Sequence, residues 1–477
     1  MYPVIPDDPV LALDIESVME EQNVNNLNKV PSQTNASKLD PNHPGRSTDL
    51  LDLQTENQFL RKQLNTCLLH GHLVFPLILS NSLRRRLLSR LSSSGAPGKT
   101  QSALCPTDES KFPKSFACSD PNDSSYFCSY GHFAIHAEMI NDIVRTESYR
   151  NFILANGSTH FAGKTVLDVG CGSGVLSLFA SEAGAAHVYG VEASMDIFAA
   201  AQETVIANQL SDRITLFRDC AESVKLPVDH VDVVISEWMG YFLLFESMLD
   251  SVIQVALRYL APDGHIYPRH YSLHLLGVSC GRKLRHDCVD LWDNVYGFQM
   301  PALHRAALAE AHILDISNPL VTGPIDAADG FRILTSKPCH LYSLDLEAVL
   351  RQRKEQPASH WSDLQSAECT IDLWIDFASD INAKYQLDAF VGYFDVHFDE
   401  NAPNQVSFST SPTSHATHWK QTVFFLEKPI TVETGDHVTG KFKIRRAIKD
   451  ARGLEFFLQL DPLHGQPIVH QLFSMVN

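Results

Sequence analysis

The glycine-rich segment DVGCGSG at residues 168–174 constrains the fold of this chain more than any other feature. It follows an apolar run typical of a buried strand, and a helical pattern begins directly after it. Glycines let a ligand approach the backbone closely, and the start of a helix carries partial positive charge. The segment therefore predicts a cofactor site between a strand and a helix.

Strand and helix patterns alternate on both sides of this loop. The runs HVYGVEA, MDIFAAAQETVIANQ, ITLFRD and VDVVIS follow in order, which is the βαβ signature of a doubly wound parallel sheet. After Pro268 the pattern changes to short alternating strands such as YSLHLLGV, FVGYFDVHF and KQTVFFL, interrupted by a helical segment around Trp292 to Glu310. We therefore expect an α/β cofactor domain over 121–268 and an antiparallel β domain over 269–477. Glu347 to Asp363 is expected to form a longer surface loop.

Residues 1–120 differ from the rest of the chain. Asn, Ser, Pro and Asp dominate Asn23 to Ser47, which reads as linker, and a short helical pattern, LLDLQTENQFLRKQL, follows. The run Arg84-Arg85-Arg86 is open to two interpretations. It is a nuclear or nucleic-acid patch, or a solvated charge run, and we favour the second.

Charge and cysteine content exclude several classes of protein. The net charge of −18 over 477 residues argues against direct binding of nucleic acid, and it favours a cationic partner or serves solubility alone. The ten cysteines include no CxxC pair, so neither a disulfide framework nor a metal site is expected, and a cytoplasmic location follows, with nuclear presence left open. The apolar stretch Cys67 to Leu79 is shorter than the roughly 20 residues that span a bilayer, so we expect no membrane association.

The spacing within the loop favours one cofactor class over another. Dinucleotide enzymes carry GxGxxG, whereas this loop reads DxGxGxG with the acid Asp168 inside it. That form suits S-adenosyl-L-methionine, which has no pyrophosphate but does have an amino-acid ammonium. Glu192, about twenty residues further on, is placed to accept both ribose hydroxyls, and Glu222 is suited to the adenine amino group. The loop alone leaves a nicotinamide-dependent dehydrogenase as the alternative.

A second constellation is the segment SEWMGYFLLFE, in which Glu237 and Glu246 bracket an apolar, aromatic loop. It follows VDVVIS at the carboxyl end of a strand, where open α/β sheets place their active sites. Carboxylates in such surroundings are costly without a cationic partner, and an arginine guanidinium is a suitable one. The alternative is a structural loop with exposed acids. Two carboxylates can draw positive charge onto the far guanidinium nitrogens and leave electron density on the attacking one.

Three separated motifs carry a resemblance to a known family. The segment YFCSY at 126–130, the double-Glu loop, and Thr417-His418-Trp419 together resemble the type I protein arginine methyltransferases, over nearly all of 122–477. The resemblance implies a Rossmann-like S-adenosylmethionine-binding domain, an antiparallel β-barrel domain, and a helical dimerisation arm over about 283–315. It also implies mono- and asymmetric dimethylarginine as products, Gly/Arg-rich protein substrates, and a homodimer. A catalytically silent scaffold that binds arginine-rich proteins is the rival hypothesis.

The resemblance also implies a role for each site residue. The catalytic residues would be a pair gripping the substrate guanidinium and a proton-handling or bracing dyad: Glu237 with Glu246, and His418 with Asp142. Tyr130, in a helical lid with Tyr126, and Trp419 would contact the substrate. The cofactor would lie against His136, Met139, Arg145, Asp168, Gly170, Glu192, Ala221 and Glu222. Met139 would leave room for a second methyl on the same nitrogen.

Within the family, SEWMGYFLLFESMLDSV and YGHFAIHAEMINDIVRTESYR resemble the third member in particular. That protein carries an N-terminal zinc finger that recruits a small-subunit ribosomal protein. Only Cys67, Cys105 and Cys118 precede Tyr126, and none has a CxxC partner, so we expect no such finger here.

Overall fold

The computed structural model describes residues 126–322, 330–355, 372–448, 450–465 and 467–476. The expectations for residues 1–120 and for Cys67, Cys105 and Cys118 lie outside these ranges. Within the described ranges, none of the helices has both the length and the apolar character needed to cross a bilayer.

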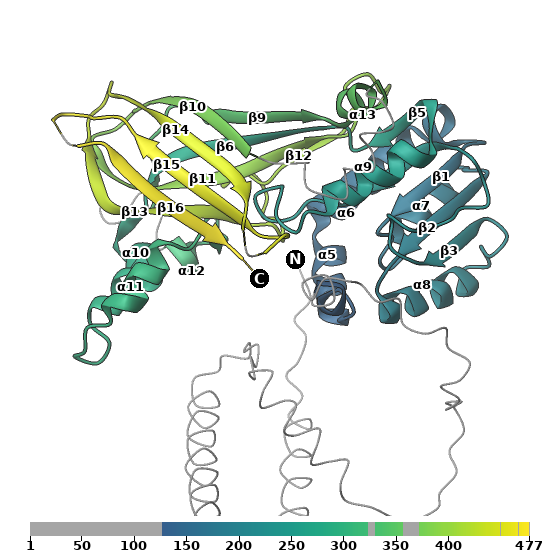
Figure 1. Ribbon diagram of the computed structural model, residues 1–477, viewed down its shortest axis with the longest axis horizontal. Helices are drawn as coiled ribbons and strands as arrows, with labels where there is room; N and C mark the ends of the chain where they lie inside the picture. Colours follow the sequence, from purple (N-terminus) through teal and green to yellow (C-terminus); the bar gives the residue numbers. More distant parts are fainter. Residues whose placement is uncertain (1–125, 323–329, 356–371, 449, 466, 477) are drawn as a thin grey trace, which may run out of the picture. The chain divides into compact units, whose positions relative to one another are not determined.

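The first part of the described chain forms a five-stranded parallel sheet in the order β3-β2-β1-β4-β5. The strands are β1 (Thr165–Val169), β2 (His187–Glu192), β3 (Ile214–Arg218), β4 (Val231–Ser236) and β5 (Leu260–Tyr267). The helices are α5 (Phe133–Asn141), α6 (Ile143–Ala155), α7 (Val175–Glu182), α8 (Met195–Ala207) and α9 (Met248–Tyr259), with a short π-helix η3 (Gly157–Phe161) (Figure 1). The order reverses at β1, which lies between β2 and β4, and ligands bind at such a switch point. The predicted Rossmann-like domain is confirmed.

Helix α9 shows how the sequence produces this packing. Its buried side chains recur at helical spacing and face β4 and β5: Leu249, Val252, Ile253, Val255, Ala256 and Tyr259. An acid in its first turn, Asp250, and a base in its last turn, Arg258, both oppose the helix dipole. The helix therefore holds the loop that precedes it, which carries Glu237 and Glu246, the two acids predicted to clamp a guanidinium (the clamp acids).

The second part of the chain folds into two antiparallel sheets, and the predicted antiparallel domain is confirmed. One sheet has the order β10-β14-β15-β16, and the other runs β7-β13-β11-β6-β8, with β12 on β11 and β9 on β6. The strands are β6 (His270–Ser279), β7 (His312–Leu314), β8 (Arg332–Ile333), β9 (Cys339–Asp345), β10 (Asp372–Asp380), β11 (Tyr385–His397), β12 (Ser407–Ser409), β13 (Gln421–Val432), β14 (His437–Arg446), β15 (Leu454–Leu460) and β16 (Val469–Met475). Phenylalanine rings form much of their core: Phe390, Phe424, Phe442, Phe456 and Phe473.

Helical segments interrupt the antiparallel sheets at two places, and the first lies between β6 and β8. The segments α10 (Gly281–Cys288), η4 (Asp290–Asp293) and α11 (Pro301–Leu308) extend away from the strands (Figure 1), with α12 (Pro319–Thr322) nearby. The helical segment predicted around Trp292 to Glu310 consists of η4 and α11, separated by a turn in which Val295 and Phe298 exchange main-chain hydrogen bonds. Tyr296 and Phe298 are exposed there.

The surface loop predicted over Glu347 to Asp363 is wrong at its start, and its residues from 356 on lie outside the described ranges. Helix α13 (Leu346–Lys354) occupies this segment, and the Asp345 side chain caps it by accepting a hydrogen bond from the Ala348 amide. Leu346 and Leu350 are buried on its inner face.

The loop between β4 and α9 joins the two sheet systems. Phe242 has its ring centroid 5.3 Å from that of Phe456 and 5.6 Å from that of Phe424. On β11, a side chain at Gly392 would place its Cβ 2.1 Å from a Phe242 ring carbon. The glycine therefore makes room for the ring, and the ring fixes the loop in the core of the antiparallel domain.

Replacing Gly392 with alanine should push Phe242 out of its seat. We expect Gly392→Ala to lower the free energy of unfolding by about 1–3 kcal/mol, as for other overpacked cores. Denaturant unfolding followed by tryptophan fluorescence would measure the loss. The double variant Gly392→Ala with Phe242→Leu has a smaller side chain at position 242 and should regain part of the lost stability. No recovery would contradict the steric explanation.

Candidate active site

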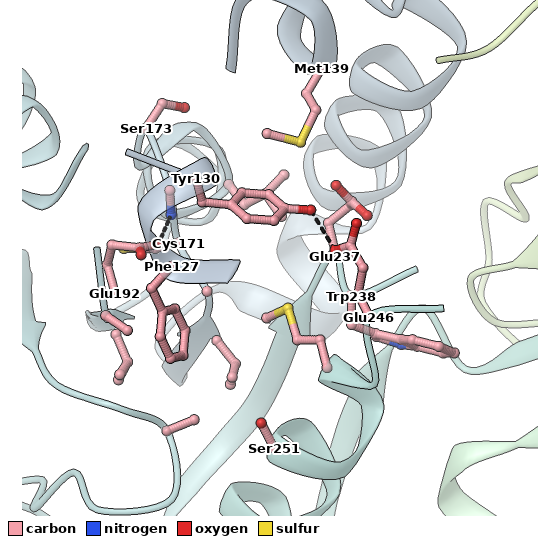
Figure 2. Close-up of a pocket in the computed structure, with 18 of the residues that line it drawn as sticks. Phe127, Tyr130, Met139, Cys171, Ser173, Glu192, Glu237, Trp238, Glu246 and Ser251 are labelled. Atoms are coloured by element: carbon pink, nitrogen blue, oxygen red, sulfur yellow. Dashed lines mark hydrogen bonds between the residues drawn. The ribbon is translucent and has the colours of Figure 1, made fainter. Parts of the chain in front are cut away.

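A cavity opens at the carboxyl edge of the parallel sheet, between the glycine-rich loop and the β4–α9 loop. Figure 2 shows side chains from both loops and from the N-terminal helical segment around it. Most of the residues predicted for the site line this cavity: Tyr130, His136, Met139, Arg145, Gly170, Glu192, Ala221, Glu222, Glu237, Glu246 and His418. Asp142, Asp168 and Trp419 are not among the lining residues.

The glycine-rich loop has the backbone that only glycines adopt easily. Gly170, Gly172 and Gly174 have φ values of 71°, 52° and 82°. The Gly172 amide donates to one Glu192 carboxylate oxygen at 2.9 Å, and the Ser194 amide donates to the other at 2.7 Å. Burial raises the pKa of Glu192, and these amide hydrogen bonds partly offset that effect. Glu192 thus ties the end of β2 to the loop.

Asp168 lies behind the loop and not in the cavity. It is fully buried, and one carboxylate oxygen accepts a 2.7 Å hydrogen bond from the Ser177 hydroxyl on α7. Burial raises its pKa to about 7. The structure thus gives Asp168 a bracing contact between β1 and α7, where the sequence predicted contact with the cofactor.

The far end of the cavity is formed by residues that follow β3 and begin α9. The Ser251 hydroxyl donates to the Glu222 carboxylate, and Arg258 donates to the Glu222 main-chain carbonyl at 2.6 Å. A Cβ on Gly170 would lie 2.3 Å from the Met248 methyl carbon, so only glycine leaves Met248 in its place. Met248 and Ser251 could not be identified as site residues from the sequence, because the start of a helix does not reveal which cavity it borders.

The first clamp acid, Glu237, already holds a guanidinium. The Arg145 Nε and Nη2 atoms both donate to Glu237 Oε2, at 2.9 and 2.7 Å, and each side chain is only 8% exposed. Burial alone would lower the pKa of Arg145, but Glu237 outweighs it and raises the pKa. The position is therefore suited to a guanidinium.

The second clamp acid, Glu246, accepts a hydrogen bond from the Tyr130 hydroxyl at 2.6 Å (Figure 2). Burial raises the pKa of Glu246 and the nearby Glu237 adds to the rise, while hydrogen bonds from Tyr130 and Tyr126 and the charge of Arg452 oppose it. Both acids thus point into one partly apolar cavity.

His418 and Asp142 meet as the sequence resemblance implied. His418 Nδ1 lies 2.7 Å from Asp142 Oδ2, and the His418 amide donates to the same oxygen at 2.8 Å. Asp142 also caps α6 by accepting from the Arg145 amide at 3.0 Å. Burial alone would raise the pKa of Asp142, but the hydrogen bonds from His418 and Arg145 hold it below its ordinary value.

Trp419 supports the site from outside the cavity. It is buried beside Phe394 and Phe408, and its indole nitrogen donates to the Met239 carbonyl at 2.7 Å. The structure thus places Trp419 as a brace for the double-Glu loop, where the sequence predicted contact with the substrate.

The N-terminal helical segment covers the glycine-rich loop. His136 Nε2 lies 2.7 Å from the Tyr130 carbonyl, and burial lowers the pKa of His136, so its imidazole is neutral near pH 7. Phe127 and Arg452 also line the cavity and were not predicted. Arg452 is over two hundred residues from the double-Glu loop, and no local pattern joins the two.

Known proteins resemble this chain in both parts of its fold. Residues 166–264 match a methyltransferase domain, and residues 270–462 match the arginine methyltransferase oligomerization subdomain. Protein arginine N-methyltransferase 1 of Chlamydomonas reinhardtii is 39% identical over 330 residues, 69% of this chain and 86% of that protein. The Schizosaccharomyces pombe protein of the same name is 39% identical over 332 residues, 69% of this chain and 87% of that protein.

The chain belongs to the protein arginine N-methyltransferase family. Its fold matches the Trypanosoma brucei PRMT1 enzyme-prozyme heterotetrameric complex with AdoHcy, with a TM-score of 0.60 and 31% identity over 73% of this chain and 99% of that chain. It also matches Arabidopsis thaliana protein arginine methyltransferase 10, with a TM-score of 0.58 and 29% identity over 73% and 99%.

As a member of this family the chain is an S-adenosylmethionine-dependent methyltransferase, as the glycine-rich loop predicted. The residues present fit that cofactor, because the Gly170 cradle admits no side chain and the Glu192 carboxylate lines the same cavity. The family's oligomerization subdomain is present as well.

Glu192 should contribute to cofactor affinity through its charge. In Glu192→Gln we expect the dissociation constant of S-adenosylmethionine to rise roughly 10- to 100-fold, the scale of a lost hydrogen bond to a charged group. Isothermal titration calorimetry would measure it, with the exposed Glu203→Gln on α8 as a matched control. Equal affinities for the two variants would remove Glu192 from the cofactor site.

Proposed function

We propose that this protein is a type I arginine methyltransferase, which forms monomethylarginine and then asymmetric dimethylarginine in Gly/Arg-rich proteins. The observation that carries the proposal is that Glu237 binds a guanidinium, that of Arg145, while Glu246 faces the same cavity. A substrate arginine would take the place between these acids, with its charge met on two sides.

The residues of the chain position and polarise the reactants. S-adenosylmethionine supplies a methyl group on a sulfonium sulfur, and the displacement is in line with that sulfur. The two carboxylates would draw the guanidinium charge toward the nitrogens they bind, leaving electron density on the attacking nitrogen. Their apolar surroundings strengthen this effect. His418, oriented by Asp142, would receive the proton that the methylated nitrogen loses.

The product type rests on Met139. Met139 lines the cavity, and by the family resemblance it would leave room for a nitrogen that already carries one methyl. The rival function, a silent scaffold, would need the same acidic cavity but no turnover. The opposing observation is that the cofactor loop, the acid pair and His418 line one cavity, and that Asp142 pairs with His418 from beside it.

Removing the charge of Glu246 tests the reaction itself. We expect wild-type protein to transfer labelled methyl from S-adenosylmethionine to a Gly/Arg-rich peptide and to yield asymmetric dimethylarginine after hydrolysis. Glu246→Gln should lose roughly 100-fold or more of kcat, because one electrostatic stabiliser of the transition state is gone. Chromatography of the hydrolysed peptide separates the methylarginines.

The control is cofactor binding by Glu246→Gln, which should stay within a few-fold of the wild type. Cofactor binding without turnover by the wild type would favour the scaffold. Symmetric dimethylarginine as the product would refute the type I assignment.

The pH dependence should report Glu246. Its pKa is raised by burial and by Glu237, so it takes up a proton at a higher pH than an exposed glutamate does. Since the clamp needs the carboxylate, kcat/KM should fall as pH drops through this raised pKa and recover above it. A pH–rate profile from pH 5 to 9 would measure the acid limb, and an acid limb no higher than the ordinary glutamate pKa would contradict the assignment. Besides burial, the groups that shift the pKa of Glu246 are Tyr126, Tyr130, Glu237 and Arg452.

We also propose a homodimer, a place within the family, a cytoplasmic location and two domains. The exposed aromatic residues of the 283–315 arm and the family's oligomerization subdomain support a homodimer. Resemblance of the double-Glu segment to protein arginine methyltransferase 3 supports kinship with that branch, with a small-subunit ribosomal protein as a substrate to test.

The scattered cysteines support a cytoplasmic location. The change from parallel to antiparallel pairing after Tyr267 supports domains at 121–268 and 269–477.

A further inference from the structure

A turn of the antiparallel domain brings Arg452 into the active site. The turn joins β14 to β15 and closes through a 3.0 Å hydrogen bond from the Ala447 amide to the Gly453 carbonyl. Inside it, the Asp450 carboxylate accepts from the Arg452 amide at 3.0 Å. The turn therefore holds Arg452 in a defined place, and Arg452 lines the cavity.

Arg452 grips the backbone of Glu246 from both sides. The Glu246 amide donates to the Arg452 carbonyl at 2.8 Å, and Arg452 Nη1 donates to the Glu246 carbonyl at 2.6 Å. Glu246 and the next residue, Ser247, have φ values of 74° and 58°, a conformation that non-glycine residues adopt only when their surroundings enforce it. The Ser247 hydroxyl adds a 3.0 Å hydrogen bond to the Ala451 carbonyl. The turn thus enforces the conformation that aims Glu246.

The Arg452 guanidinium also contacts the lid, the helical segment 126–130. Its central carbon lies 3.8 Å from the ring centroid of Tyr126 and 5.5 Å from that of Phe127, the distance range of cation–π contacts. The Tyr126 ring lies 4.9 Å from Tyr130, whose hydroxyl donates to the Glu246 carboxylate. The contacts form a closed circuit from Arg452 through Tyr126 and Tyr130 to Glu246 and back.

A second arginine of the same turn provides the comparison. Arg446, at the end of β14, pairs with Asp250 on α9 and so also fastens the turn to the cofactor domain. Arg446 is not among the residues that line the cavity. A merely structural role in docking the turn belongs equally to both arginines, whereas contact with lid and clamp belongs to Arg452.

We propose that Arg452 is a positioning residue for methyl transfer, which couples closure of the lid over the cofactor to the orientation of Glu246. The inference rests on the proposed role of Glu246 as a clamp for the substrate guanidinium. It requires that loss of Arg452 weakens cofactor retention by the lid and orientation of Glu246 together, although the lid and Glu246 belong to different parts of the chain.

The test compares Arg452→Met, Arg452→Lys and Arg446→Met as full-length proteins. For Arg452→Met we expect kcat/KM for a Gly/Arg-rich peptide to fall roughly 10- to 100-fold, with faster release of S-adenosylmethionine in stopped-flow experiments. Arg452→Lys keeps the charge and a donor and should recover part of both. Arg446→Met should stay within a few-fold of the wild type in both. Thermal unfolding of each variant identifies loss of folding.

A double-mutant cycle then asks whether Arg452 acts through the lid. Tyr126→Leu should show the same two defects, and adding it to Arg452→Met should cost less than the two single losses combined. Wild-type rates in Arg452→Met, equal losses in Arg446→Met, or additive effects in the cycle would each overturn the proposal. An inactive wild type would instead refute the proposed function, so the two failures are distinguishable.

Discussion

The burial of the double-Glu loop between the two sheet systems is the constraint on which the site depends. Its apolar residues belong to the hydrophobic core, with Phe242, Leu243 and Leu244 each no more than 3% exposed. Phe242 fills the space above Gly392 and contacts the phenylalanines of the antiparallel sheets. Two carboxylates are thus carried at fixed positions by a loop whose own folding is driven by hydrophobic burial. Placing two carboxylates in an apolar cavity costs free energy, and the hydrophobic burial of the same loop offsets that cost.

Three acids in or beside the cavity have named partners. Glu237 faces Arg145, Glu246 faces Tyr130, and Asp142 faces His418. Breaking such a pair leaves a buried charge uncompensated, which costs far more than the pair itself contributes to folding. These pairs also link elements that are distant in sequence, since Arg145 lies in the first turn of α6 and Glu237 follows β4. The electrostatic network therefore sets the geometry of the cavity as much as it sets its charge.

The fold could be predicted from the sequence where local pattern and tertiary structure agree. The alternation around residues 168–174 identified the parallel sheet, and the short strands after Pro268 identified the antiparallel part. Failures came where side-chain contacts across the chain decided the outcome. Helix α13 depends on Leu346 and Leu350 finding a buried surface, and no periodicity over nine residues reveals that surface. Asp168 and Trp419 sit inside the predicted motifs, yet they brace the site from behind it. Arg452 lies in an ordinary polar turn, and only the docking of that turn makes it part of the site.

The ion pair between Arg145 and Glu237 also affects how strongly an arginine from another protein can bind. While this pair stands, Glu237 is held by a residue of the protein itself. An arginine from another protein has to compete with an intramolecular rival whose effective concentration is very high. The pair thus lowers the net attraction between Glu237 and an incoming arginine, because part of the Glu237 charge is already satisfied within the chain.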